Sequence, residues 1–243
     1  MRRYLAWLVD LLLPQVCVVC GRRCIGGATG LACAVCWSRV AWLGEPQCQR
    51  CGYPGPGRDC AWCRLLPPYV RAARSLAWVP GGVSGVLLHA LKYSGWWRVA
   101  EGIALRMARL TWPDDVVTER SAIVPVPLAA ERLAQRGYNQ SEYLARFLAR
   151  YWQIPVWSGV VRRRVATRSQ ARLTAAARLG NVAGAFEVVV PATLLEGKHL
   201  ILLDDVITTG ATMNSCAAEL FAAGARTLSY ITFGRARLPG DAP

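Results

Sequence analysis

The stretch ILLDDVITTGAT, residues 201–212, places two adjacent carboxylates directly after a run of apolar residues. These are Asp204 and Asp205, and small residues and threonines follow them. Backbone N–H groups in a loop of small residues can surround an anion, and the positive end of a following helix adds to the attraction. A ligand whose phosphate binds in this loop and whose two vicinal hydroxyls bind the carboxylates would be a ribose 5-phosphate. The loop is not a Walker loop, because no lysine follows its glycine and the spacing differs.

A second group of reactive side chains lies near the N-terminus, where eight of the ten cysteines form four CxxC pairs. A CxxC turn presents two thiolates at the separation that tetrahedral Zn²⁺ needs, and two turns complete a set of four ligands. The pattern repeats, since CVVCG returns as CQRCG, and this indicates two copies of one unit. We therefore expect two structural Zn²⁺ ions, with these ligands: Cys17, Cys20, Cys33, Cys36, Cys48, Cys51, Cys60 and Cys63.

Several alternatives exist for the cysteines. A disulfide framework would require an oxidising compartment, and we find no export signal. The four pairs can share ions sequentially or crosswise, and we expect sequential pairing because each half then closes locally. Cys24 is a spare that could replace a ligand, and Cys216 is expected to be a small buried residue. Gly21 and Gly52 each follow a second cysteine, where the turn is expected to need positive φ.

The elements that must position the carboxylates follow from about residue 69, where strands and helices alternate. Strands are expected at 74–79, 121–126, 154–161, 200–203 and 226–233. Helices are expected at 82–95, 97–110, 141–152 and 211–223, with Gly224 as the C-cap of the last. Such alternation favours an α/β fold, a parallel sheet with helices on both faces, in which ligands bind beyond the carboxyl ends of the strands. The carboxylate pair and its loop are expected at that end.

We expect two domains. Residues 1–68 would hold an N-terminal helix and a double zinc-finger domain, and residues 69–243 the α/β domain. A cysteine block rich in Gly and Pro cannot bury much surface, so the metal must supply folding energy. Zinc modules of this kind bind nucleic acid or protein, or brace a neighbouring domain, and the sequence leaves these roles open.

The formal net charge is +14, which indicates a polyanionic partner or simply a basic, Arg-rich proteome. The first residues, MRRYLAWLVDLLLPQVC, imitate a secretion signal, but Asp10 interrupts the apolar run and no small-residue cleavage site follows. The run is also shorter than the roughly 20 residues that span a bilayer. We therefore expect residues 3–13 to form a short amphipathic helix, no membrane span, and a cytoplasmic location.

The segment LILLDDVITTGAT resembles the signature with which type I phosphoribosyltransferases bind phosphoribosyl pyrophosphate (PRPP). Both have an apolar strand, two acidic residues and a TTGAT-like phosphate loop. The resemblance implies that Asp204 and Asp205 are the catalytic pair, which holds the ribose 2′- and 3′-hydroxyls, and that Mg²⁺ arrives with PRPP. It also implies a set of phosphate-binding residues: Val206, Thr208, Thr209, Gly210, Ala211 and Thr212.

Three further stretches resemble the ComF family, which includes ComFC- and GntX-type proteins. They are ALKYSG (90–95), IVPVPLAAERLAQRGYNQSEYLA (123–145) and RRRVATRSQARLTAAARLGNVAGAF (162–186). Together with the four CxxC pairs, the resemblance covers nearly the whole chain. It implies a zinc-finger head on a type I phosphoribosyltransferase-like domain. For some members it also implies a role in DNA uptake during natural transformation.

The arginine-rich stretch lies where type I enzymes have a mobile hood. Between residues 162 and 181 there are six arginines and no acidic residue, and arginine would neutralise a pyrophosphate. Asn139 and Gln140 are amides suited to a base or ribose edge, although Asn139 could simply cap the helix that follows. The candidates for pyrophosphate or hood contacts are these: Lys92, Arg132, Arg136, Asn139, Gln140, Arg163, Gln170 and Arg178.

One departure from the wider superfamily concerns the base. Purine-salvage members carry an Asp four residues after the first acidic residue, and here that position is Thr208. The first hypothesis is therefore a phosphoribosyltransferase with an unidentified acceptor. The second is a protein that binds PRPP or a nucleotide without catalysis. Its zinc head and basic surface would engage single-stranded DNA, or a helicase or channel partner in DNA uptake. A structural adaptor is a third hypothesis.

Overall fold

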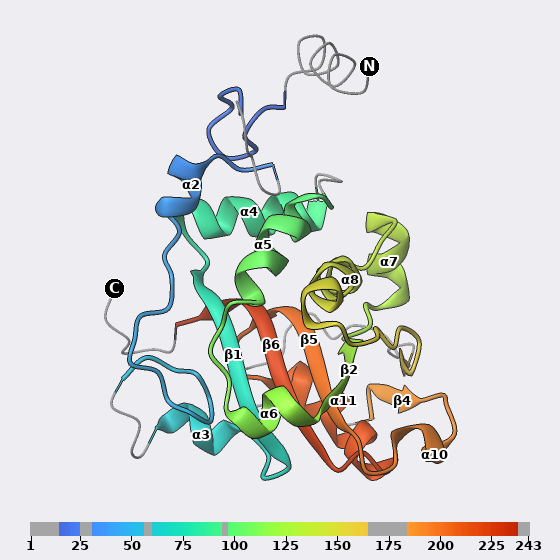
Figure 1. Ribbon diagram of the computed structural model, residues 1–243. Helices are drawn as coiled ribbons and strands as arrows, with labels where there is room; N and C mark the ends of the chain where they lie inside the picture. Colours follow the sequence, from blue (N-terminus) through green and yellow to red (C-terminus); the bar gives the residue numbers. More distant parts are fainter. Residues whose placement is uncertain (1–14, 25–30, 56–59, 94–96, 165–183, 238–243) are drawn as a thin grey trace, which may run out of the picture.

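Four parallel strands form the central sheet of the computed structural model, in the order β1-β6-β5-β2 (Figure 1). They are β1 Val70–Val79, β2 Arg120–Pro125, β5 His199–Ile207 and β6 Thr227–Ala236. The structure describes residues 15–24, 31–55, 60–93, 97–164 and 184–237. The two central strands are β6 and β5, so the carboxylate pair lies on a central strand of the sheet rather than on an edge strand.

Helices cover both faces of this sheet. One face carries α4 Gly82–Tyr93, α5 Val99–Met107 and α8 Gln140–Trp152, and the other carries α11 Ala211–Ala222. Alternation along β5 divides its apolar side chains between the two cores. Ile201 and Leu203 pack toward the first face, whereas Leu200 and Leu202 pack toward the second. The predicted α/β class, with helices on both faces, is confirmed.

Short elements complete the described fold. The remaining helices are α2 Ala34–Ser38, α3 Ala61–Leu65, α6 Asp114–Glu119, α7 Ala130–Arg136 and α10 Ala192–Leu195. An antiparallel hairpin pairs β3 Val161–Arg163 with β4 Phe186–Val188, and it flanks the arginine-rich segment. None of the described helices is long and apolar enough to cross a lipid bilayer.

Most predicted elements are confirmed, with shifted ends. Strand β1 begins at Val70, before the predicted start, and α5 ends at Met107, well before Pro113. Strand β5 continues through Asp204 and Asp205 to Ile207, so the pair lies within the last part of the strand. The helix expected at 3–13 lies outside the described residues.

The predicted strand at 154–161 is wrong. This segment makes one parallel bridge, Ile123 with Val156, through backbone hydrogen bonds from Ile123 to Pro155 and from Trp157 to Ile123. Proline has no N–H to donate to a ladder, and Gly159 turns the chain with φ 80°. This segment thus pairs with the edge strand β2 at a single residue, and the chain next forms a strand in the β3–β4 hairpin.

The end of α11 also differs in detail from the prediction. The C-cap is Ala223, and Gly224 follows it with φ 107°. The backbone N–H of Gly224 donates to Phe221 and that of Ala225 to Leu220, which is the pattern of a Schellman motif. The glycine is needed at the residue after the cap, where the backbone becomes left-handed.

The cysteine block runs along the free edge of β1. Trp78 N donates to Ala41 O and Ala73 N donates to Arg50 O, both at 2.7 Å, and Trp42 bridges Ala77. An unpaired edge strand is a site for aggregation, and this cover removes much of it. The first half of the block shares a core with α4, α5 and α8, and the second half shares one with α11. The first half thus packs with the helices of one face and the second half with the helix of the other; in Figure 1, α2 lies beside α4 and α3 lies near the start of β1.

Candidate functional site

Asp204 and Asp205 occupy the carboxyl end of β5 and face opposite sides of the sheet. Asp205 lies on the same face of β5 as Leu203, the face against which α4 and α8 pack, and it is buried. Asp204 lies on the same face of β5 as Leu202, the face toward α11, and it is partly exposed. Strand alternation explains this split, because adjacent side chains in a strand point to opposite faces. One carboxylate is thus available on each side of the strand end.

Asp205 is surrounded by donors. Lys92 Nζ of α4 lies 3.2 Å from Asp205 Oδ2, and Gln140 Nε2 donates to the same oxygen at 2.6 Å. The structure brings together three residues that the sequence analysis selected from three separate stretches. An ionised carboxylate in a buried position requires such partners.

Asp204 experiences a different environment. Although part of the residue reaches the surface, protein surrounds its carboxyl group; this desolvation, and then the negative charge of Asp205, raise its pKa to about 7. Hydrogen bonds from the Asp205 N–H, at 2.8 Å, and from Ser141 Oγ, at 2.9 Å, partly oppose this increase, as does the charge of Lys92. Ser141 was missed by the sequence analysis. Its position in the sequence could have identified it: Ser141 follows Gln140 directly, at the start of a helix that points at the carboxyl ends of the strands.

The loop after the pair forms a small cradle. Its residues 206–213 line a cavity of about 40 Å³, and Thr208 and Thr209 are exposed there. Gly210 has φ 82° and precedes α11, so the chain turns sharply before the first helical N–H groups. A loop of this kind, which opens a helix of three turns, presents backbone donors and a positive helix end to an anion.

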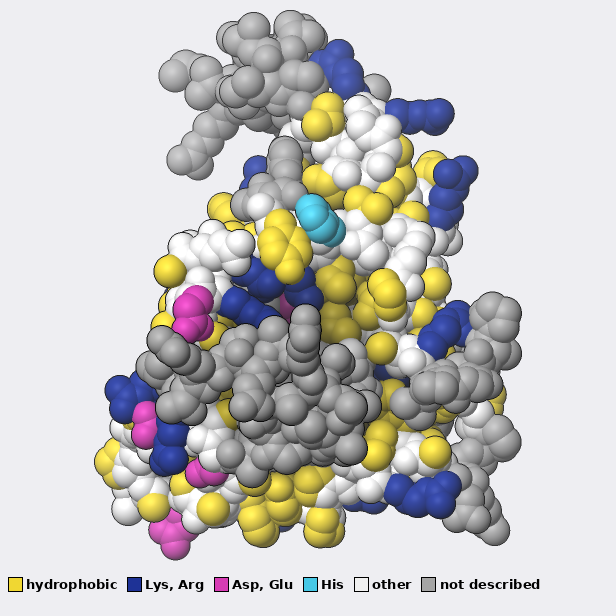
Figure 2. All heavy atoms as spheres, turned by 180° about the vertical axis from the view of Figure 1, so that it is seen from behind, with side chains coloured by type: hydrophobic (Ala, Val, Ile, Leu, Met, Phe, Trp, Pro, Cys, Tyr) yellow, Lys and Arg dark blue, Asp and Glu magenta, His cyan; other side chains and the backbone are white. Residues whose placement is uncertain are grey.

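Several arginines gather around the same end of the sheet. Arg136 Nη1 donates to Gln140 Oε1 at 2.9 Å, and its guanidinium lies over the Tyr93 ring, 4.7 Å from the centroid. Burial lowers the pKa of Arg163; the nearby charge of Arg132 lowers it further, and Asp204 opposes both. Figure 2 shows Lys and Arg side chains gathered in a hollow of this face, with an acidic side chain behind them. The electrostatic character of the hollow suits a polyanion.

The other predicted contacts divide into two groups. Asn139 caps α8, since its Oδ1 accepts from Ser141 N at 3.0 Å and its Nδ2 donates to Val126 O at 3.0 Å. The plainer role, helix capping, is therefore the one seen for Asn139. Gln170 and Arg178 lie outside the described residues.

The eight predicted thiols form two clusters. Cys17, Cys20, Cys33 and Cys36 make one, Cys48, Cys51, Cys60 and Cys63 make the other, and within each cluster all four sulfur atoms lie within 4.8 Å of one another. The sequential pairing is confirmed. Tetrahedral Zn²⁺ with Zn–S of about 2.3 Å would hold sulfur atoms roughly 3.8 Å apart, so both clusters fit the ion.

Without the metal, the thiols of each cluster differ in their surroundings. Burial raises the pKa of Cys17, but backbone N–H groups outweigh it and lower the pKa to about 6, and a similar balance brings Cys48 to about 7. Burial raises the pKa of Cys36, Cys51 and Cys63 instead. Gly21 and Gly52 have φ 69° and 65°, as expected after the second cysteine of a CxxC turn. Cys24 is not one of the four clustered thiols, but it lies beside them: burial, and then the charges of Cys17, Cys33 and Cys20, raise its pKa. Cys216 is fully buried in α11, as expected.

The second cluster is joined to the sheet by a buried arginine. Arg235 of β6 is fully buried, donates to Cys51 O at 2.6 Å and lies 4.7 Å from the centroid of the Trp62 ring. Its Nη1 has no hydrogen-bond partner within the described residues. Four thiolates around Zn²⁺ carry a net negative charge, and the guanidinium beside them provides the opposite charge.

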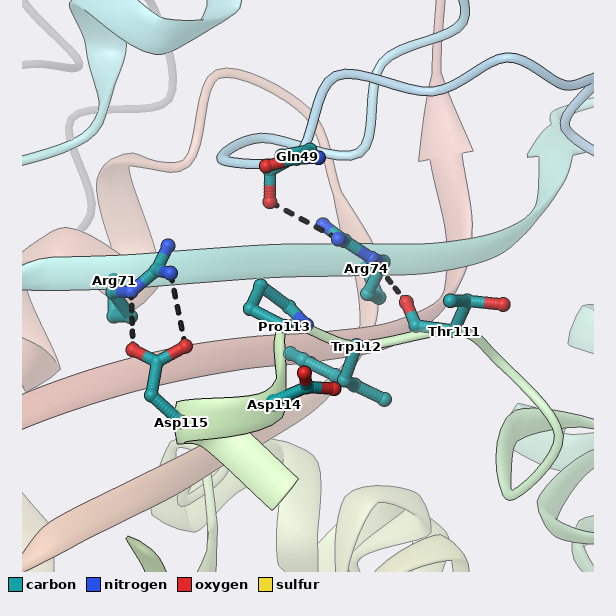
Figure 3. Close-up of a pocket in the computed structure, with 8 residues that line it drawn as sticks. All are labelled: Gln49, Arg71, Arg74, Thr111, Trp112, Pro113, Asp114 and Asp115. Atoms are coloured by element: carbon teal, nitrogen blue, oxygen red, sulfur yellow. Dashed lines mark hydrogen bonds and ion pairs between the residues drawn. The ribbon is translucent and has the colours of Figure 1, made fainter. Parts of the chain in front are cut away.

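A larger cavity, about 450 Å³, lies on the free edge of β1, away from the carboxylate pair (Figure 3). Three of its charged side chains, those of Arg71, Arg74 and Asp115, are already paired with one another or with the backbone. Arg71 Nη2 donates to Asp115 at 2.9 Å, and the buried Arg74 donates to Thr111 O at 2.7 Å and Gln49 O at 3.0 Å. This hollow joins the second cysteine unit to the sheet, and its chemistry is structural.

Comparisons with known proteins agree with this arrangement. Residues 8–65 match the family model of the double zinc ribbon domain. The chain is 32% identical over 228 residues to DNA utilization protein YhgH of Escherichia coli O157:H7, which covers 90% of this chain and 96% of that protein. It is 36% identical over 115 residues to competence protein F of Haemophilus influenzae, 47% of this chain and 50% of that one.

Among solved structures, the chain is similar to glutamine PRPP amidotransferase from Bacillus subtilis, complexed with ADP and GMP. The identity is 18%, the TM-score is 0.36, and the match covers 62% of this chain and 26% of that one. The relationship to the Escherichia coli protein spans both the cysteine block and the α/β part.

Proposed function

The chain belongs to the ComF family, and from this membership we propose that its α/β part binds PRPP with Mg²⁺ and transfers the phosphoribosyl group to a nitrogen nucleophile. The names of its relatives, a DNA utilization protein and a competence protein, support a role in DNA uptake during natural transformation. We place this role in the cytoplasm, where two zinc ions would stay bound to reduced cysteines.

One observation carries the proposal: the carboxylate pair and the anion cradle are consecutive parts of a single strand–loop–helix unit. Carboxylates accept hydrogen bonds from hydroxyls, and a helix-opening loop donates them to phosphate. The two chemistries lie next to each other, as they do in a ribose 5-phosphate. Residues 206 and 208–212 are the proposed phosphate contacts.

The surrounding cations are proposed to bind the pyrophosphate. Lys92, Arg136 and Arg163 come from three different elements around the strand end, and Arg132 is near Arg163. In the transfer, the bond from ribose C1 to pyrophosphate breaks and pyrophosphate leaves, a C1–N bond forms, and the proton of the nucleophile is released to water. Asp204 and Asp205 would stabilise the positive charge that develops on the ribose, and the cations would stabilise the leaving group; Mg²⁺ brought in with PRPP would supply further positive charge there.

A second candidate function rests on two observations. Thr208 stands where purine-salvage enzymes carry a carboxylate, which favours binding of PRPP or a nucleotide without catalysis. The exposed Trp97 ring also stacks on Tyr143 and Phe147 of α8, which are partly buried against the core. Aromatic faces among cations suit single-stranded nucleic acid, so such a protein would bind DNA, or a helicase or channel partner, in a ligand-dependent way.

Calorimetry with PRPP and Mg²⁺ tests the site. We expect the wild type to bind, and Asp204→Asn or Asp205→Asn to weaken binding at least about tenfold, because each loses a charged acceptor for a hydroxyl. The control is Asp114→Asn, which changes one member of another adjacent Asp pair, at the start of α6. Inorganic pyrophosphate with Mg²⁺ should bind all four proteins about equally.

The outcomes separate the hypotheses. If the wild type does not bind PRPP, both candidate functions fail. If it binds PRPP but releases no pyrophosphate with any base in a panel of purines, pyrimidines and their precursors, the non-catalytic function is favoured. Salt-dependent binding of single-stranded DNA that disappears on zinc chelation would support a role of the cysteine block in DNA contact.

A further inference from the structure

The first two residues of α8 reach the carboxylate pair from the side of the helix. Gln140 Nε2 donates to Asp205 Oδ2 at 2.6 Å, and Ser141 Oγ donates to Asp204 Oδ1 at 2.9 Å. Both residues are buried, with 2% and 0% of their surface exposed. Buried polar side chains are retained where they have partners. The partners of these two are the carboxylates, one each, although the carboxylates point to opposite faces of β5.

Each carboxylate is held by only one of its oxygens. Asp204 Oδ1 accepts from Ser141 and from the Asp205 N–H, and Asp205 Oδ2 accepts from Gln140 and Lys92. Within the described ranges, Asp204 Oδ2 and Asp205 Oδ1 have no protein donor. The pair therefore offers two acceptor oxygens, one on each carboxylate, which is the number that two vicinal hydroxyls require.

We propose that Gln140 and Ser141 are positioning residues: each ties down one oxygen of one carboxylate, so that the second oxygens of Asp204 and Asp205 are held ready for a ribose diol. This inference rests on the proposed function, and it assigns Gln140 a task different from contact with a base or pyrophosphate. Neither residue touches the ligand. They act by fixing the rotation of the two carboxylates, which a short side chain at the end of a strand would otherwise explore.

The orientation of the Gln140 amide is determined by its neighbours. Arg136 donates to its oxygen at 2.9 Å, so its NH₂ group must face Asp205. A cation on one side and an anion on the other can be bridged by an amide, which accepts at one end and donates at the other. A glutamate at this position would face Asp205 with a second negative charge, and a methionine would leave both partners without a hydrogen bond.

The start of α8 is itself anchored. Asn139 accepts from Ser141 N and donates to Val126 O, just after the end of β2, each at 3.0 Å. The helix start is thus tied to the neighbouring strand before its first two side chains reach β5. This support explains how residues 63 and 65 positions away in the chain can hold the carboxylates.

Paired sugar phosphates test the inference. The probes are ribose 5-phosphate and 2-deoxyribose 5-phosphate, which differ by one hydroxyl, and binding is measured by calorimetry for the wild type, Gln140→Met and Ser141→Ala. We expect the wild type to bind ribose 5-phosphate more tightly than 2-deoxyribose 5-phosphate. In each variant, the ratio of these two affinities should fall roughly tenfold. Affinity for 2-deoxyribose 5-phosphate should fall less, because its phosphate contacts remain.

The ratio of affinities distinguishes positioning from a merely structural role, since a loosened helix would weaken both sugar phosphates alike. Gln153→Met, at the exposed end of the same helix, is the matched control and should keep the wild-type ratio. Ser141→Ala removes a single oxygen atom, so it keeps the test available if Gln140→Met fails to fold.

Two different failures are separable. If the wild type binds neither sugar phosphate, the proposed function is overturned. If the wild type prefers ribose 5-phosphate and both folded variants retain the same preference, the positioning role is overturned while the proposed function stands.

Discussion

At the scale of single residues, Asp204 and Asp205 are neighbours in the chain with unlike surroundings. Asp205 faces a lysine and a buried amide, whereas Asp204 faces a hydroxyl and one backbone N–H. Two carboxylates this close cannot both ionise without cost. In the ligand-free protein, burial and the charge of Asp205 therefore favour the neutral form of Asp204. Under the proposed function, the positive charge that develops on the ribose would favour its ionised form.

The raised pKa of Asp204, about 7, predicts a pH dependence of stability. The folded state holds this proton more tightly than the unfolded state, so this group's contribution is present at pH 4 and is lost as pH rises toward 7. Asp204→Asn removes the ionisation. We expect the variant to gain stability relative to wild type between pH 5.5 and 7.5, on the order of 2 kcal/mol.

Urea unfolding of the ligand-free proteins at the two pH values measures this difference, and comparison at each pH cancels effects of zinc loss common to both. Parallel pH profiles for wild type and variant would show that Asp204 is ionised throughout this range.

At the scale of elements, the CxxC turns that precede Gly21 and Gly52 differ in how closely they approach the sheet. A Cβ on Gly52 would lie 2.4 Å from Ala73 O of β1, whereas a Cβ on Gly21 would have nothing within 4 Å. Both glycines have left-handed backbone, with φ 65° and 69°. Their local turns are therefore alike, and only the second one is pressed against a strand.

These glycines form a matched pair of variants. Gly21→Ala should cost about 1 kcal/mol of stability, the usual cost of a left-handed alanine, and Gly52→Ala should cost several kcal/mol more because backbone must shift. Thermal or urea unfolding measures both, with zinc content as the check on metal binding. Equal losses would show that the CxxC turn before Gly52 does not depend on its contact with β1.

At the scale of the whole molecule, the second cysteine cluster and the sheet share a charge pair. Arg235 is buried beside Cys51, and burial lowers its pKa, while the thiolates of Cys51 and Cys60 oppose that change. We propose that residues 1–68 and 69–243 do not unfold independently, because removal of the second zinc would leave this guanidinium buried without its counter-charge.

Cysteine variants of the two clusters test this coupling. Cys63→Ser, in the second cluster, should lower stability of the α/β part by roughly 3 kcal/mol more than Cys20→Ser, in the first. Circular dichroism during urea unfolding reports on the α/β part, and metal analysis confirms loss of one ion in each variant. Similar midpoints for the two variants would contradict the proposed coupling.

Much of this fold could be predicted because its signals are local. The CxxC spacing specifies ligand pairs, and the order of apolar strand, carboxylates, small-residue loop and helix specifies the place of the pair at a sheet end. The prediction of a strand at 154–161 was wrong. Pro155 and Gly159 are visible in the sequence, but the sequence does not say which strand this segment would pair with, and so it does not show that they prevent the pairing.

The sequence by itself determined which residues are chemically able to act: eight thiols in four CxxC pairs, two adjacent carboxylates and the loop that follows them. Only the tertiary structure decided how they are held. Gln140 and Ser141 meet the carboxylates across 65 and 63 residues, Arg235 meets the second cluster, and the two cysteine units pack with helices of opposite faces of the sheet. Local spacing is set by backbone geometry, whereas contacts between distant residues exist only once the sheet has brought its strands together.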